Sequence, residues 1–450
     1  MNKHFNIPQD AKNIIAKLNQ AEKQALLVGG CVRDHLLGLS PNDYDVASNA
    51  LPCEVIEIFK GHTVIPTGLK HGTVTIITDI GPIEITTFRR DGLYTNNRRP
   101  TNVEFASEFK DDAPRRDFTI NAMGYDPQNG VYDYFGGMDD LNNKIIRCVG
   151  DANVRFNEDA LRILRAIRFS SQLGFSIEAK TEEAIFTNKH LLANISPERI
   201  STEFIKLLCG DNALNVLCKY HSVIEVFIPE IAPMVGFDQH NFHHIYDIWI
   251  HTAHTVKNSL KTPAARLTAF FHDIGKPQTF SLSDDGIGHF YGHSAAGCEI
   301  ASNVLKRLKF DNFTHDRVLT LIKYHDLQIP EDESIIKKHL SKFSPEVFFE
   351  LLDIFRADNL SIAPEFQDRQ NHYNNLEGIA RKILQEKPCL KVKDLAINGN
   401  DLMSLGIAPS KQMGKILSEL LDGVLGGEYQ NEKSELLSIV CEKIRKNCKD

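Results

Sequence analysis

The chain has 450 residues, of which 42% are hydrophobic and 24% are charged, and its formal net charge is −8. This composition is typical of a soluble globular protein with sizeable cores, and the length favours about three domains. The apolar runs are shorter than the roughly 20 residues that a membrane span needs. The acidic balance also excludes a chain that is basic throughout, so binding to a polyanion would need local basic faces.

The start of the chain and its cysteines predict a cytoplasmic protein with no membrane association. The opening segment, MNKHFNIPQDAKNII, lacks the continuous apolar core of a signal peptide. The nine cysteines are odd in number and contain no C-x-x-C pair. We therefore expect reduced thiols rather than a disulfide framework or a zinc ribbon.

The order of the predicted elements indicates an α+β protein. Residues 10–26 have the pattern of an amphipathic helix, and residues 26–150 mix turns with short β-rich runs such as TVTIIT and PIEITTF. From about residue 157 onward, apolar residues recur at helical spacing. We expect a mixed sheet with helices over residues 1–150, and helical segments over residues 151–230, 231–345 and 346–450.

Residues 27–49, LVGGCVRDHLLGLSPNDYDVASN, combine a glycine pair with two aspartates one residue apart. NDYDVAS reads as a short strand, so Asp43 and Asp45 point to the same side. Two adjacent carboxylates repel each other unless a proton or a cation lies between them, and Mg²⁺ prefers such oxygen ligands. A solvated turn is the alternative for a D-x-D pattern taken alone.

The glycine pair favours a phosphate site, and a later strand offers a third carboxylate. Gly29 and Gly30 let backbone N–H groups approach a phosphate, and Arg33 follows as a fixed cation. The G-x-G-x-x-G and P-loop patterns are both absent. In GPIEITTFRR, Glu84 alternates with buried-type isoleucines, so it is a candidate third catalytic carboxylate or a residue of the solvent face.

This segment resembles the signature of the nucleotidyltransferase superfamily that includes DNA polymerase beta. It is most similar to class II tRNA nucleotidyltransferases, the CCA-adding enzymes, and to the related bacterial poly(A) polymerases. Further resembling motifs follow in order: RRDFTINAM (115–123), DYFGGMDDL (133–141), EDALRILRAIRF (158–169) and SPERISTEF (196–204). The resemblance implies a nucleotidyltransferase head over residues 1–150 and a helical neck over residues 151–230.

The motif EDALRILRAIRF places Asp159, Arg162, Arg165 and Arg168 three residues apart. On one helix this spacing forms a polar stripe, which is either a solvated basic face or a ligand-binding one. Such carboxylate and guanidinium groups can hydrogen-bond a base edge and a triphosphate. The resemblance implies that Asp159 and Arg162 read CTP and ATP, and that Arg165 and Arg168 bind the nucleotide.

RRDFTINAM and the segment before it bear on nucleotide binding and on specificity. The resemblance implies that Arg116 binds the nucleotide while Asp117 and Asn121 organise the site, although such a motif alone also fits a surface salt-bridge cluster. Residues 89–114 are polar and rich in Gly and Asn, which is typical of a mobile loop. In the resembled family a loop here helps to switch from C to A addition. Asn96 stands where many relatives carry Asp, which leaves the final specificity open.

The implied activity is template-independent addition of CCA to the 3′ end of tRNA, with CTP and ATP as substrates and pyrophosphate as product. The 3′-OH attacks the α-phosphorus at two Mg²⁺ ions held by Asp43 and Asp45, while Gly30, Arg33 and Arg116 hold the triphosphate. The alternatives are an A-adding enzyme, a poly(A) polymerase, and a hydrolase whose head only binds nucleotides. No obligate protein partner is evident.

Residues 240–330 are unusually rich in histidine. His251, His272, Asp273 and Asp326 form an H…HD…D order, and His293 and His325 could complete a second metal position, with His254 as an alternative ligand. This mixture of ligands suits a divalent transition metal. FHDIGKP resembles the HD phosphohydrolase superfamily, which implies an HD domain over residues 231–345 that hydrolyses phosphomonoesters or 2′,3′-cyclic phosphodiesters. A helical scaffold that only supports tRNA is the alternative.

The last segment, residues 346–450, resembles the helical tail of many CCA-adding enzymes. Lys411 and Lys415 could contact the tRNA backbone there, although exposed lysines usually have no such specific role. The resemblance therefore implies a tail that binds tRNA.

Overall fold

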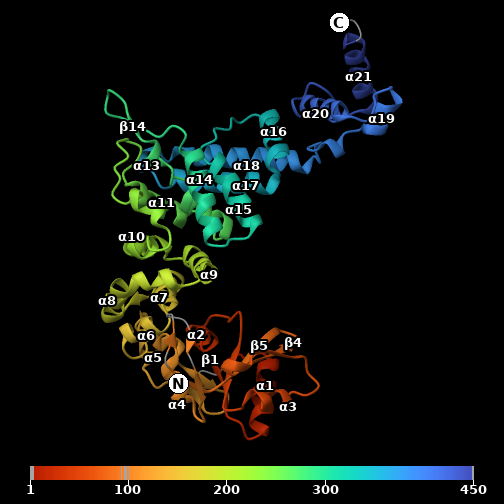
Figure 1. The fold of residues 1–450 in the computed structure, drawn as a ribbon. Coiled ribbons are helices and arrows are strands. Elements are labelled where there is room, and N and C mark those ends of the chain that lie inside the picture. Colours follow the sequence, from red (N-terminus) through yellow and green to blue (C-terminus); the bar gives the residue numbers. More distant parts are fainter. Residues whose placement is uncertain (1–4, 93, 96–98, 101, 448–450) are drawn as a thin grey trace. The chain divides into compact units, whose positions relative to one another are not determined.

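The computed structural model describes residues 5–92, 94–95, 99–100 and 102–447. Its contacts divide the chain into two compact units, Met1–Pro229 and Glu230–Asp450. The first unit contains a seven-stranded sheet, whereas the second is almost entirely helical (Figure 1), which confirms the α+β class. Among the described residues, no helix is long and apolar enough to cross a membrane. Asn96 lies outside the described residues.

The sheet of the first unit has the strand order β11-β10-β1-β2-β5-β4-β3. Strands β2 and β5 run parallel, and every other neighbouring pair in this sheet is antiparallel. The strands are β1 (Ala25–Val28), β2 (Asp45–Ser48), β3 (Val64–Gly68), β4 (Thr73–Thr78), β5 (Gly81–Thr87), β10 (Gly124–Asp126) and β11 (Gly130–Tyr132). Three helices accompany them, α1 (Gln9–Gln20), α2 (Gly30–Leu37) and α3 (Pro52–Ile58).

The alternation of side chains explains how the sheet presents its carboxylates. In β5, Ile83 and Ile85 are buried while Glu84 between them is exposed. The parallel register of β2 and β5 pairs Asp45 directly with Glu84. Gly29 follows β1 with φ +76°, a conformation that residues with a Cβ rarely adopt, and this lets α2 begin immediately after the strand.

The rest of the first unit consists of short elements and a group of helices. The short elements are β6 (Arg89–Asp91), β7 (Tyr94–Thr95), β8 (Arg99–Pro100), β9 (Val103–Phe105), α4 (Phe109–Asp112), α5 (Gly137–Asn142), β12 (Ile145–Ile146) and β13 (Ser176–Ile177). The helices are α6 (Ala152–Glu158), α7 (Leu161–Leu173), α8 (Ala179–Asn188), α9 (Pro197–Leu208) and α10 (Ala213–Ile224). Helix α7 packs against α9, and this contact positions the segment EDALRILRAIRF.

The second unit is built from helices α11 to α21 and one small hairpin. Its elements are α11 (Ile248–Asn258), α12 (Pro263–Phe271), α13 (Lys276–Thr279), β14 (Ser281–Leu282), β15 (Gly288–His289), α14 (His293–Arg307), α15 (Asn312–Tyr324), α16 (Glu333–Phe343), α17 (Pro345–Asn359), α18 (Gln370–Gln385), α19 (Gly399–Ser404), α20 (Lys411–Leu425) and α21 (Lys433–Asn447).

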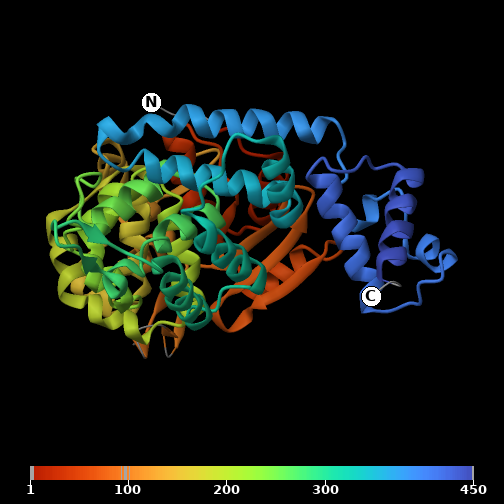
Figure 2. The same cartoon turned by 90° about the horizontal axis from the view of Figure 1, so that it is seen from above.

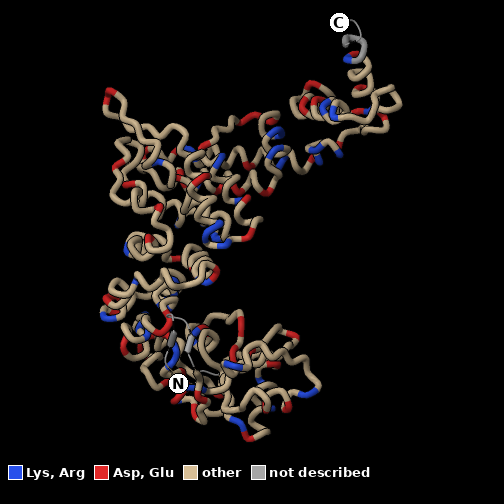
Figure 3. The backbone as a smooth tube through the Cα atoms, viewed as in Figure 1, with Lys and Arg blue, Asp and Glu red and all other residues tan. Residues whose placement is uncertain are grey.

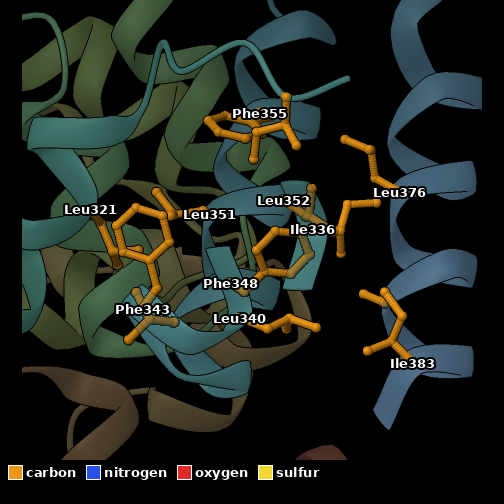
Figure 4. Packing of buried hydrophobic residues seen from close by; sticks show 13 residues of the cluster. Leu321, Ile336, Leu340, Phe343, Phe348, Leu351, Leu352, Phe355, Leu376 and Ile383 are labelled. Carbon is orange, nitrogen blue, oxygen red and sulfur yellow. The ribbon is translucent and has the colours of Figure 1, made fainter. Parts of the chain in front are cut away.

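Two apolar cores hold helices α15 to α21. In the first, Phe348 of α17 packs among side chains of α15, α16 and α18, with Leu376 and Ile383 facing it from α18 (Figure 4). In the second, α19, α20 and α21 gather around Leu402, Leu420 and other buried residues (Figure 2). The tail after α18 therefore has a core of its own.

Candidate active site and metal centre

A pocket of about 810 Å³ lies in the first unit, between the head sheet and the helices that follow it. It brings together residues from separate sequence motifs. The sequence-predicted residues that line it are Gly29, Gly30, Arg33, Asp43, Asp45, Arg116, Asp117, Asn121, Asp159, Arg162, Arg165 and Arg168. Glu84 does not line this pocket, although its strand register places it beside Asp45.

The carboxylates of the head form a negative group that Arg116 only partly neutralises. Asp43 and Asp45 are exposed to the pocket, but the surrounding protein displaces much of the water around Asp45. This desolvation, together with the Asp43 and Glu84 carboxylates, raises the pKa of Asp45 to about 6, and the Arg116 cation only partly opposes it. Carboxylates placed this close together fit a divalent cation.

The glycine pair lies against two arginines. A Cβ on Gly29 would come within 3.7 Å of Arg116 Nη1, and one on Gly30 within 3.6 Å of Arg33 Nη2. Arg33 is buried, donates from Nη1 to Asn121 Oδ1 over 2.9 Å, and is thereby fixed. The site thus combines backbone that a phosphate can approach with two oriented cations.

Asp112, which the sequence analysis missed, orients the arginines of RRDFTINAM. Its buried carboxylate accepts hydrogen bonds from Arg115 Nε at 2.7 Å and from Arg116 Nη2 at 3.0 Å. Burial raises the pKa of Asp112, but the two arginines outweigh this effect and hold it below its usual range. In the segment DAPRR, Asp112 lies three and four residues before the two arginines, and this spacing could have predicted the contacts.

Two arginines of α7, Arg165 and Arg168, are held by buried acids. Arg165 donates from Nε and Nη2 to Asp117 Oδ2, over 2.8 and 2.6 Å. Burial raises the pKa of Asp117, but the pairing with Arg165 lowers it to about 2. Arg168 donates from Nε to Glu203 Oε2 over 2.8 Å, and both side chains are buried. Glu203 was missed because its partner lies 35 residues away.

The predicted four-residue stripe is correct for the arginines and wrong for Asp159. Helix α7 begins at Leu161, and Asp159 lies before it in extended backbone with φ −135° and ψ 101°. Its carboxylate still reaches the pocket wall. Arg162 donates to Glu158 Oε2 over 2.8 Å and to the backbone carbonyl of Arg115 over 2.6 Å.

Six arginines and one lysine line this pocket. Outside it, Lys and Arg positions are interspersed with Asp and Glu along both units (Figure 3). A pocket with several arginines in an acidic chain therefore marks a built anion site rather than a general basic face.

A second cluster lies inside the second unit. His251 of α11 and His272, at the end of α12, approach Asp273 Oδ2 with Nε2 distances of 3.4 and 3.2 Å. His293 and His325 approach the other oxygen, Oδ1, at 3.7 and 3.8 Å. The structure thus brings five of the six predicted residues together around one buried carboxylate.

The prediction that Asp326 belongs to this cluster is wrong. Asp326 is exposed just after α15, whereas Asp358 of α17 supplies the carboxylate, with Oδ1 at 2.9 Å from His251 Nε2. Helix α17 packs against α11 and α12, so Asp358 faces the histidines. Its position seven residues after Leu351 and three after Phe355, both buried, would have revealed an acid on the core-facing side of the helix.

All four imidazoles of the cluster are oriented in the same way. Each places Nδ1 within hydrogen-bond distance of a backbone carbonyl, which directs the Nε2 lone pair towards the cluster. The acceptors are Ser361 for His251 (3.1 Å), Ala269 for His272 (2.8 Å), Phe290 for His293 (2.9 Å) and Ile322 for His325 (2.7 Å). Nε2 atoms then meet in two pairs, at 3.3 and 3.1 Å, which a shared cation would hold together.

The remaining candidates lie elsewhere. His254 stacks on Tyr246 with ring centroids 4.4 Å apart, and it is not part of either ligand group found among the described residues. Lys276, which was not among the predicted residues, contacts Asp273 Oδ2 of the cluster over 2.7 Å. Lys411 and Lys415 are exposed on α20.

Comparisons with known proteins agree with this arrangement. Residues 25–147 match the family model described as the poly A polymerase head domain, residues 174–234 match a probable RNA and SrmB-binding site of polymerase A, and residues 294–440 match a putative tRNA nucleotidyltransferase domain 2. The CCA-adding enzyme of Ligilactobacillus salivarius is 33% identical, over 96% of both chains. This chain belongs to the CCA-adding enzyme family.

Other members of the CCA-adding enzyme family support the same conclusion. The CCA-adding enzyme of Pediococcus pentosaceus is 34% identical and covers 98% of both chains. The crystal structure of the Bacillus stearothermophilus CCA-adding enzyme in complex with CTP matches with a TM-score of 0.70 and 28% identity, over 98% of both chains. Since these relatives align along nearly the whole chain, the poly(A) polymerase alternative is not favoured.

Proposed function

We propose that this protein adds CCA to the 3′ end of tRNA from CTP and ATP, without a nucleic-acid template. The observation that carries the proposal is the pocket of the first unit, where two adjacent carboxylates face several fixed arginines. The printed names of the relatives and the structure solved with CTP support it. The activity is nucleotidyl transfer with release of pyrophosphate.

The carboxylates fit a Mg²⁺ site, because Asp45 lies beside two further acids that disfavour its ionisation. Asp43 and Asp45 would hold the ions, and Glu84 would add negative charge from the neighbouring strand. When bound, Mg²⁺ supplies charge that activates the 3′-OH and stabilises the leaving oxygen. The chain itself contributes two preorganised carboxylates on one short segment.

Different arginines of the pocket would bind different parts of the nucleotide. Gly30, Arg33 and Arg116 would hold the triphosphate. The two arginines lie beside the glycine pair, where the backbone N–H groups can approach a phosphate closely. Arg165 and Arg168 extend the cationic wall, each fixed by a buried acid. Asp117 and Asn121 keep these cations in place.

The residues that choose the base would be Asp159 and Arg162, which line the same pocket. A carboxylate accepts hydrogen bonds from an amino group, and a guanidinium donates to ring nitrogen or carbonyl oxygen. Both cytosine and adenine carry such an amino group on the edge that pairs. This pair therefore suits C and A.

Incorporation of labelled nucleotides tests the proposal. Wild-type protein should incorporate CMP into tRNA that lacks its CCA end, and AMP into tRNA that ends in CC. Asp43→Ala should abolish both reactions while tRNA binding, measured by gel shift, stays near the wild-type level. Turnover near wild type in that variant would overturn the assignment of Asp43.

A second proposed activity is metal-dependent phosphate-ester hydrolysis in the second unit. The observation that favours it is the convergence of four imidazole Nε2 atoms with the Asp273 and Asp358 carboxylates. Imidazoles mixed with carboxylates suit a divalent transition metal, which polarises water and phosphate when bound. Phosphomonoesters and 2′,3′-cyclic phosphodiesters are the proposed substrates.

Metal analysis and a hydrolase assay separate this activity from a purely structural role. The protein, incubated with Mn²⁺, Co²⁺, Ni²⁺ or Zn²⁺ and dialysed, should retain metal and hydrolyse p-nitrophenyl phosphate or 2′,3′-cyclic AMP. His251→Ala should lose both properties, while CMP incorporation is retained. A wild-type protein that retains no metal and hydrolyses neither substrate would support the scaffold alternative.

The remaining assignments are proposals about organisation. We assign residues 1–150 to the nucleotidyltransferase head, 151–230 to the neck, 231–345 to the HD domain and 346–450 to a tail that binds tRNA through groups such as Lys411 and Lys415. We also propose a cytoplasmic location. A lysine-to-alanine pair at 411 and 415 should weaken tRNA binding and reduce its salt dependence.

A further inference from the structure

Arg199, in the first turn of α9, holds the carboxylate of Asp159. Its Nη2 lies 2.9 Å from Asp159 Oδ2 and its Nη1 lies 3.3 Å from Oδ1, so the guanidinium donates to both oxygens. The backbone N–H of Leu161 also donates to Oδ1, over 3.2 Å. Three donors therefore fix the plane of a carboxylate that borders the nucleotide pocket.

The neighbouring Arg162 is held by other groups. Arg162 directs its guanidinium to Glu158 and to the backbone carbonyls of Arg155 and Arg115. Arg199 also lies outside the group of residues that line the pocket, so it is placed behind Asp159 rather than beside the substrate. Arg199 therefore supports the base-reading carboxylate and does not itself contact the base.

Helix α9 contacts both the Asp159 carboxylate and the arginines of the nucleotide site. One turn after Arg199, Glu203 holds Arg168 at 2.8 Å and lies 3.7 Å from Arg165. The same helix packs along α7, which carries those arginines. The motif SPERISTEF thus orients the carboxylate that reads the base and the cations that bind phosphate.

We propose that Arg199 is a positioning residue that sets base specificity, an inference that rests on the proposed function of Asp159. By holding the carboxylate in one plane, Arg199 presents a fixed acceptor to the substrate. The amino groups N4 of cytosine and N6 of adenine donate to such an acceptor. The carbonyls O4 of uracil and O6 of guanine are repelled by it.

Loss of the guanidinium should lower specificity more than activity. In Arg199→Ala the Asp159 carboxylate can rotate, so it discriminates less between an amino group and a carbonyl. The ratio of kcat/KM for CTP to that for UTP should fall by about 5- to 100-fold, the discrimination that one well-placed polar contact to a base supplies. Arg199→Lys keeps the charge but not the planar fork, so its ratio should lie between those of wild type and Arg199→Ala.

A matched control is available at another bidentate pair of the first unit. Arg147 donates from Nε to Asp140 Oδ2 over 3.0 Å and from Nη2 to Oδ1 over 3.2 Å, away from the nucleotide pocket. Arg147→Ala removes the same kind of contact, and its ratio of CTP to UTP use should stay at the wild-type value.

The experiment measures kcat/KM for all four nucleoside triphosphates on tRNA that lacks CCA, with melting temperatures of every variant. The inference is supported if the ratio of kcat/KM for CTP to that for UTP falls in Arg199→Ala, falls less in Arg199→Lys and is unchanged in Arg147→Ala. If Arg199→Ala does not fold, the Arg199→Lys ratio decides. Equal losses for all four nucleotides, with the ratio preserved, would overturn it. A wild type that adds no CMP or AMP would instead refute the proposed function.

Discussion

Replacing Glu203 with alanine would leave the guanidinium of Arg168 buried without its counter-ion. Glu203 is 6% exposed and Arg168 is 8% exposed, so neither charge can turn into solvent. Breaking a buried pair by removing one partner costs about 3–5 kcal/mol. Arg168 keeps a hydrogen bond to Gln172 Oε1 at 2.9 Å and its position over the Phe169 ring, so we expect a loss near the lower limit, about 3 kcal/mol.

Urea unfolding of wild type, Glu203→Ala and Glu203→Gln measures this effect. The glutamine keeps an acceptor oxygen of the same reach, so it should lose clearly less stability than the alanine. KM for CTP and for ATP should rise together in Glu203→Ala, because Arg165 and Arg168 both lose a support. A loss below about 1 kcal/mol in Glu203→Ala would refute the reasoning, since that is the range of an exposed pair.

Three further changes test other parts of the structure. Asp358→Ala should lower metal retention at least about tenfold while Asp326→Ala leaves it unchanged; the reverse order would reject the corrected ligand set. Gly275→Ala places a Cβ against the backbone carbonyl of His293. It should therefore cost about 1–3 kcal/mol of stability and reduce metal retention. An unchanged melting temperature would contradict this close approach. In the folded protein the pKa of Asp117 is about 2, below its ordinary 3.8. The wild type should therefore be more stable than Asp117→Asn by about 2 kcal/mol above pH 4, and this difference in unfolding free energy should vanish as the pH falls towards 2. If the pairing were absent, urea unfolding at stepwise lower pH would show a constant difference.

Local periodicity predicted much of the head. The alternation of side chains in a strand predicted that Glu84 is exposed between buried isoleucines. The same pattern was extended too far at Asp43, because β2 begins only at Asp45 and Asp43 lies in the segment before it. The motif order identified the family, because five ordered segments constrain a chain far more than composition does. The fold class followed from the change from strand-like to helical patterns near residue 150.

The errors came from features that a local pattern does not contain. The three-residue spacing continues through Asp159, but the break between α6 and α7 removes that residue from the helix. Asp326 directly follows a histidine of the cluster, yet the ligand position is filled by Asp358, which only the packing of α17 brings there. Glu203 and Arg199 were overlooked as partners for the same reason, since they meet their targets across 35 and 40 residues.

The sequence of the product 3′ ends tests the central claim most directly. Wild-type protein is incubated with Mg²⁺, all four nucleoside triphosphates and tRNA that lacks its CCA end, and the products are sequenced. The product ends should read CCA and extend no further, and Asp43→Ala should add nothing under the same conditions. Tails of A, or no addition to this tRNA while tRNA that ends in CC receives A in a parallel reaction, would contradict CCA addition.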